Sequence, residues 1–136
     1  LITGFKKVTL FMKTEQQFVI VFCERNFLGK RQILLGKKKR GFGEGKWNGF
    51  GGKVEKNENS FEAAKRELHE ESNLLANEFV FRGNLTFELP TYPKIMKISV
   101  MEAVHWSGDL KETEEMKPKW FDITEIPYSK MWKDDI

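Results

Sequence analysis

The chain has 136 residues, enough for one domain with its own hydrophobic core, and its twelve Phe and four Trp exclude a disordered chain. The net charge of +3 is too small to indicate nucleic-acid binding by itself, and a single cysteine excludes an internal disulfide. No apolar run approaches about 18 residues and no charged-then-apolar leader is present. We therefore expect no membrane span, no signal peptide and a reducing, intracellular setting.

Two apolar segments in the first third of the chain predict strands. Residues 18–23 form a continuous apolar run, as expected for a strand that is buried on both faces. The run contains Cys23, which we interpret as a small core residue. Residues 32–35 predict a second, shorter strand.

A basic run and a series of glycines follow the second strand. Residues 37–40 are all Lys or Arg and precede the glycine-rich segment 41–45. Such runs are usually solvated loops, and a place beside substrate phosphates is the alternative. Three further glycines surround Phe50 in the segment 49–52, where we expect a close approach of the backbone to a neighbouring group.

One helix is strongly indicated after residue 59. Asn59 can cap it, and Glu62, three residues on, completes a capping box. Phe61, Ala64 and Leu68 recur at helical spacing and supply an apolar stripe for the core.

Three acids lie on this helix at spacings of three and four, next to the apolar stripe: Glu67, Glu70 and Glu71. Like charges so placed cost about 0.2–0.5 kcal/mol per pair, which a bound cation would offset. Carboxylates without thiolates or imidazoles suit Mg²⁺ or Mn²⁺, and the two distant histidines of the chain argue against zinc. The residues alone leave an alternative open, an acidic solvent face paired with Lys65 and Arg66.

The remaining elements are predicted to be strands. Residues 85–89 and the stretch around Ile98 and Val100 alternate between apolar and polar, which indicates half-buried strands, and two prolines mark the turn between them. A last short strand is expected at residues 120–121. One helix among several strands predicts a mixed α/β (α+β) domain.

The helix and its flanks resemble the Nudix box, the signature of hydrolases of nucleoside diphosphates linked to another moiety. That pattern is G-x5-E-x7-R-E-hydrophobic-x-E-E-x-G-hydrophobic, and the chain resembles it at eight of nine positions. The departure is Asn73 in place of glycine, at a position that needs a left-handed conformation, which Asn tolerates best after Gly. The matching positions are Gly52, Glu58, Arg66, Glu67, Leu68, Glu70, Glu71 and Leu74.

The resemblance implies a single domain over residues 1–136, with a mixed sheet sandwiched between helices. Residues 1–16 match the family poorly, and the helix and strand with which family members continue are absent. We therefore expect a C-terminally truncated domain that is marginally stable or inactive.

The resemblance also implies the parts of a metal-dependent site. One of the helix glutamates acts as base, Arg66 orients a glutamate, and Glu58 braces the loop. Mg²⁺, with Mn²⁺ as the alternative, is bound by an implied ligand set of the Gly51 carbonyl, Glu67, Glu70, Glu71 and Glu115.

Residues 36–54, 115–121 and 126–135 resemble one subgroup, the oxidised purine nucleoside triphosphate hydrolases or 8-oxo-dGTP diphosphatases. The resemblance implies Mg²⁺-dependent hydrolysis of 8-oxo-dGTP and 2-oxo-dATP to monophosphate and pyrophosphate, which keeps mutagenic precursors out of DNA. The implied substrate residues are Lys38, Phe42, Asn48, Phe87, Met96, Trp132, Asp134 and Asp135.

The residues themselves leave simpler alternatives open for this set. Phe87 and Met96 are apolar enough to be core, Asn48 can cap a turn, and Asp134 and Asp135 can belong to an acidic tail. Alternative functions are hydrolysis of a dinucleoside polyphosphate, ADP-ribose or capped RNA, and non-catalytic nucleotide binding. We expect a monomer that acts on small-molecule nucleotides in the cytoplasm, with nucleus or mitochondrion as alternatives, and no stable nucleic-acid or membrane partner.

Overall fold

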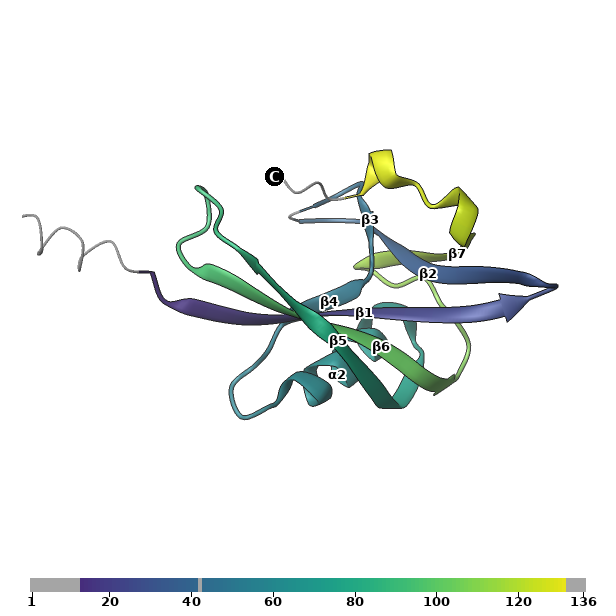
Figure 1. The fold of residues 1–136 in the computed structure, drawn as a ribbon, viewed down its shortest axis with the longest axis horizontal. Helices are drawn as coiled ribbons and strands as arrows, with labels where there is room; N and C mark the ends of the chain where they lie inside the picture. Colours follow the sequence, from purple (N-terminus) through teal and green to yellow (C-terminus); the bar gives the residue numbers. More distant parts are fainter. Residues whose placement is uncertain (1–12, 42, 132–136) are drawn as a thin grey trace, which may run out of the picture.

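A computed structural model describes residues 13–41 and 43–131 of the chain (Figure 1). Its strands form one mixed sheet of seven, with α2 on one side (Figure 1). This confirms the predicted mixed α/β (α+β) class. The elements are β1 (Glu15–Phe27), β2 (Lys30–Lys38), β3 (Trp47–Asn48), β4 (Phe50–Lys53), α2 (Ser60–Ser72), β5 (Leu75–Phe87), β6 (Ile95–Ser107), β7 (Met116–Asp122) and two 3-10 turns, η1 (Ile123–Glu125) and η2 (Tyr128–Lys130).

Strand β1 is the centre of the sheet. It pairs with β6 in parallel and with β2 and β4 in antiparallel fashion, and β2 in turn pairs with β3 and β7. Val19, Val21 and Cys23 of β1 are at most 2% exposed and face the core, whereas the alternating Phe22 is half-buried. The apolar run is therefore a strand, as predicted, but the expected burial on both faces is wrong, because only one face is fully buried in the part of the chain that the structure describes.

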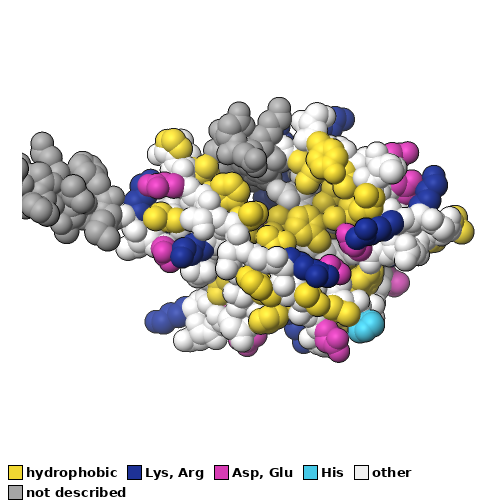
Figure 2. Space-filling model, in the orientation of Figure 1, with side chains coloured by type: hydrophobic (Ala, Val, Ile, Leu, Met, Phe, Trp, Pro, Cys, Tyr) yellow, Lys and Arg dark blue, Asp and Glu magenta, His cyan; other side chains and the backbone are white. Residues whose placement is uncertain are grey.

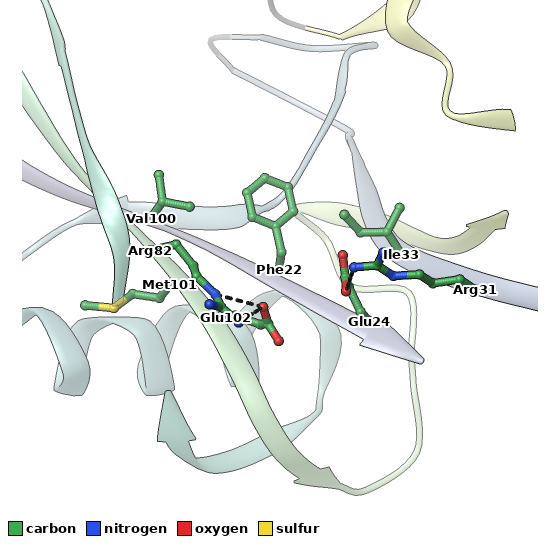
Figure 3. A pocket seen from close by; sticks show the side chains of 8 residues that line it. All are labelled: Phe22, Glu24, Arg31, Ile33, Arg82, Val100, Met101 and Glu102. Carbon is green, nitrogen blue, oxygen red and sulfur yellow. Dashed lines mark hydrogen bonds and ion pairs between the residues drawn. The ribbon is translucent and has the colours of Figure 1, made fainter. Parts of the chain in front are cut away.

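The half-buried face of the sheet carries a hollow of about 480 Å³ (Figure 3). Phe22, Ile33 and Val100 project into it from three neighbouring strands, away from α2 (Figure 3). Apolar side chains also gather on the face of the molecule that Figure 2 shows. Two arginine–glutamate pairs flank the hollow, each with a closest N–O distance of 2.8 Å: Arg31–Glu24 and Arg82–Glu102.

Helix α2 forms as the sequence predicts, except that Phe61, which the sequence assigns to the apolar stripe, is 49% exposed. Asn59 Oδ1 accepts a hydrogen bond from the Glu62 N–H at 2.8 Å, and the Asn59 N–H donates to Glu62 Oε1 at 2.9 Å, which completes the capping box. Ala64 and Leu68 are fully buried in the core cluster. The helix ends at Ser72, and its C-cap Asn73 has φ 69°, the predicted left-handed conformation.

Five strands are longer than predicted: β1, β2, β5, β6 and β7. The pairing of β5 with β6 shifts register near Ala76, Glu78 and Gly83, so the bulges interrupt the alternation that signals a strand. Strand β7 contains Pro118, which argues against a strand in sequence-based reasoning, but β7 pairs with β2 alone and an edge strand tolerates proline. In the part of the chain that the structure describes, no helix is long and apolar enough to cross a membrane.

Asn73 offers a test of the helix C-terminus, because its side-chain amide also donates to the Asp109 carbonyl at 2.8 Å. Asn73→Ala keeps the strained φ and loses this bond, so we expect it to lower the free energy of unfolding by about 1–2 kcal/mol. Asn73→Gly loses the bond but relieves the strain, and we expect a change below about 1 kcal/mol. Urea denaturation of both variants measures this; equal losses would contradict the assigned strain.

Cys23 offers a test of the core. Its side chain is fully buried, and burial, with a smaller contribution from Glu102, raises the pKa of its thiol to about 12. Three pKa units reduce the thiolate fraction by on the order of a thousandfold, and the thiolate is the reactive form. We expect a thiol reagent to modify the native protein at least that much more slowly than the urea-unfolded protein. Rapid modification under native conditions would show that β1 is not in the core.

Candidate functional site

The guanidinium group of Arg66 joins the loop before α2 to the acids on α2. Its Nη2 lies 2.6 Å from Glu58 Oε1 and donates to the Lys53 carbonyl at 3.1 Å. Its Nη1 lies 2.7 Å from Glu67 Oε1 and 3.4 Å from Glu70 Oε2. The Glu58 and Glu67 carboxylates hold the pKa of Arg66 above its ordinary value, so the group stays charged and fixes the loop against the helix.

Two of the helix acids are buried against β4. Glu71 is 4% exposed and accepts a hydrogen bond from the Gly51 N–H at 2.8 Å. Burial, followed by repulsion from Glu67, raises the pKa of the Glu71 carboxyl to about 8. Glu67 is 9% exposed; burial raises its carboxyl pKa, and Arg66 opposes that rise. Lys38 favours the charged form of both acids.

The other two predicted acidic ligands are less buried. The side chain of Glu70 is 56% exposed. Glu115 lies at the start of β7, where Arg40 binds its carboxylate at 2.6 Å and lowers its pKa. Lys38 lies 3.9 Å from Glu115, and the negative charge of Glu115 contributes to the raised pKa of Glu71. The fold therefore brings Glu115 near the helix acids from 44 residues further along the chain than Glu71.

The donor set suits a hard divalent cation, although the acids do not converge on one point. Within residues 13–41 and 43–131, no three acidic, His or Cys side chains form a ready-made metal cluster. Arg66 engages Glu67 and Glu70, while the Gly51 N–H engages Glu71. The two buried carboxylates repel each other beside oxygen-rich neighbours, and a cation with oxygen ligands would relieve that repulsion.

Close backbone approach explains the glycines beside the acids. A Cβ atom on Gly51 would stand 2.0 Å from the Val19 carbonyl oxygen. A Cβ atom on Gly52 would stand 2.7 Å from Glu67 Oε1. Glycine is therefore required for β4 to pair with β1 on one side and to receive the acids of α2 on the other.

The predicted substrate residues that fall within the described part of the chain lie on β2, β3, β5 and β6. Phe87 and Met96 are directly opposite each other in the β5–β6 pair, half-buried and outside the core cluster. Asn48 is half-buried in β3, and its Oδ1 accepts from the Gly49 N–H at 2.8 Å, as a turn cap would. Trp47 bridges to Met131, so the chain returns to β3 near its end. Phe42, Trp132, Asp134 and Asp135 lie outside the described residues.

Sequence reasoning missed the contacts that fix the loop after β2. Lys39 Nζ binds Glu112 at 2.6 Å and the Thr113 carbonyl at 2.8 Å, next to the pair between Arg40 and Glu115. The partners are more than 70 residues apart in sequence, and no local pattern relates them.

The two glycines give a paired prediction. We expect Gly51→Ala to lower the free energy of unfolding by about 2 kcal/mol or more, because the added methyl group meets backbone that cannot move away. We expect Gly52→Ala to cost about 1 kcal/mol, because it meets the end of the Glu67 side chain, which can rotate. Denaturant titration of both variants measures this; a Gly52→Ala cost as large as that of Gly51→Ala would contradict the packing described.

Comparison with known proteins gives consistent matches. A family model described as NUDIX domain matches residues 14–136. A Danio rerio protein named "Oxidized purine nucleoside triphosphate hydrolase" is 50% identical over 105 residues, 77% of this chain and 67% of that protein. A Mus musculus protein of the same name is 42% identical over 124 residues, 91% and 77% of the respective chains. The crystal structure of a MutT NUDIX hydrolase from Burkholderia pseudomallei has a TM-score of 0.74 at 23% identity, covering 85% of this chain and 88% of that one.

Proposed function

The chain belongs to the NUDIX family of hydrolases, and from that premise we propose that it hydrolyses oxidised purine nucleoside triphosphates such as 8-oxo-dGTP and 2-oxo-dATP. The products are the monophosphate and pyrophosphate. The chemistry is supported by the buried pair Glu67 and Glu71 beside Arg66. The substrate is supported by the two relatives that carry the corresponding name, at 50% and 42% identity.

Members of this family generally need a divalent metal ion, and we propose Mg²⁺, with Mn²⁺ as the alternative. The residues proposed to hold it are the carbonyl of Gly51 and the carboxylates of Glu67, Glu70, Glu71 and Glu115. When bound, such an ion neutralises charge on the phosphate oxygens and orients them.

The protein residues around this ion have separable roles in the proposal. Arg66 orients Glu67 by a charge-assisted hydrogen bond of 2.7 Å, and the Gly51 N–H holds one oxygen of Glu71. The positive charge of Lys38, on β2, favours the ionised form of the same acids, and in this proposal Lys38 also meets a phosphate group. One of the three helix glutamates takes the proton of the attacking water.

Base recognition is proposed to use the face of the sheet around β3 and the β5–β6 hairpin. Phe87 and Met96 present adjacent apolar side chains, and Asn48 offers a polar edge. Trp132 would stack on the base, with Phe42 as a further apolar wall. In Asp134 and Asp135, one carboxyl that holds a proton and one that does not would match the donors and acceptors of different oxidised purines.

We expect pyrophosphate release from 8-oxo-dGTP in the presence of Mg²⁺ and little release from dGTP or ADP-ribose, measured on this chain. A chelator should abolish the release. Preference for ADP-ribose would instead support the alternative nucleotide substrates. If no substrate is turned over but the chain shows a cooperative thermal transition, the result would support a folded, non-catalytic nucleotide-binding module. If no substrate is turned over and no such transition is seen, the result would support the expected marginal stability of the chain.

Glu71→Gln tests the buried acid. We expect kcat to fall by on the order of a hundredfold or more, because the charge that would face the metal and substrate is lost. Glu78→Gln, an exposed acid on β5, is the matched control and should keep the parent kcat. Near-parent activity of Glu71→Gln would remove Glu71 from the proposed site. The monomeric state and cytoplasmic location stay predictions, for gel filtration and cell fractionation to check.

A further inference from the structure

A second pocket, of about 310 Å³, lies where β2 leaves the sheet and the following loop folds back on it. It is separate from the hollow that contains Phe22 and Val100. Lysines supply most of its charged groups. Its lining consists of Lys37, Lys38, Lys39, Glu44, Gly45, Glu112 and Lys117.

Lys37 and Lys117 are directly opposite each other in the antiparallel pair of β2 and β7. Side chains so placed point to the same face with Cβ atoms roughly 4.5–5.5 Å apart, and like charges there destabilise a sheet. Both side chains are exposed. Among the described residues, the lysines that form ion pairs are Lys13, Lys30, Lys38, Lys39 and Lys97, so neither member of this pair has an acidic partner within 4.0 Å.

The acids of the pocket do not neutralise it. Glu112 is bound by Lys39 at 2.6 Å, and Lys117 further lowers the pKa of the Glu112 carboxyl. Glu44 forms no ion pair within the described part of the chain. Four lysines against two glutamates leave a net charge of +2 in the lining. Two lysines at directly opposite positions of a strand pair, neither with an acidic partner among the described residues, favour an anion with several oxygens.

The pocket adjoins the candidate active site through Lys38. That residue lines the pocket, and its positive charge also acts on Glu67 and Glu71. Lys37 and Lys38 are consecutive in β2, so their side chains point to opposite faces of the strand, and Lys38 is the lining residue that the pocket shares with the candidate active site. The volume of about 310 Å³ is large enough to admit a diphosphate.

We propose that this pocket binds a diphosphate group through Lys37 and Lys117. The source nearest at hand is the pyrophosphate that the proposed function releases, and the assignment of that source rests on the proposed function. The terminal phosphates of a bound nucleotide offer the same chemistry. Binding to the pocket itself needs neither turnover nor a metal ion, so failure of one proposal can be told from failure of the other.

The test is a titration of the whole chain with pyrophosphate in the presence of EDTA, followed by two-dimensional ¹H–¹⁵N NMR. We expect saturable shifts at the amides of Lys37, Gly45 and Lys117. The double variant Lys37→Gln/Lys117→Gln should weaken binding by about tenfold or more, since two charge-assisted contacts are lost. The matched control is Lys56→Gln/Lys65→Gln, two exposed lysines outside the pocket, which should bind as the parent does.

A further variant separates binding from a structural role. Glu44→Gln removes a negative charge from the lining and should tighten pyrophosphate binding by about two- to threefold at low salt, an effect that salt screens. Inorganic phosphate and dGTP, titrated in the same way, distinguish a free diphosphate from the end of a nucleotide.

Three outcomes overturn the proposal: equal affinity of the pocket variant and its control, shifts confined to α2 and β4, or no saturable shift. A thermal transition at the parent temperature shows that the double variant is folded. If that variant does not fold, the Glu44→Gln titration decides, and unchanged or weaker pyrophosphate binding by it overturns the proposal.

Discussion

The burial of Glu67 and Glu71 against the backbone of β4 is the constraint on which the rest of the site depends. Burial raises the pKa of both carboxyls, the negative charge of Glu67 raises that of Glu71 further, and such burial costs free energy unless a cation or a donor is close. Arg66 supplies the donor on one side and the Gly51 N–H on the other. Glycine alone allows β4 to come this close to both β1 and α2. The burial of these acids therefore also requires glycine at positions 51 and 52.

The loop after β2 is held to the segment before β7. The positive charge of Lys38 acts on Glu71, its ammonium group lies 3.9 Å from Glu115, and the chain turns after it. Lys39 and Arg40 make that turn rigid by binding Glu112 and Glu115 across more than 70 residues of sequence. One short loop thus joins the acids of the candidate active site to the basic pocket beside it.

Local signals were the ones that sequence reasoning interpreted correctly. The capping box at Asn59 and the left-handed Asn73 depend on residues within four positions of each other, and both are confirmed. Strands β5 and β7 were underestimated because a bulge and an edge proline are indistinguishable from a strand end when the partner strand is unknown. The roles of the substrate residues stay predictions, and those of Trp132, Asp134 and Asp135 concern residues that the structure does not describe.

The sequence by itself determined the helix, its caps, the spacing of its acids and membership of the family, because these depend on short-range periodicity and on a motif of fixed spacing. Only the tertiary structure decided which acids are buried, which basic side chain each acid contacts, and that Lys37 stands opposite Lys117. The physical reason is that burial and strand register arise from contacts between segments far apart in the chain. The pKa of an ionisable side chain and the partner that it binds are set by those contacts and not by its neighbours in sequence.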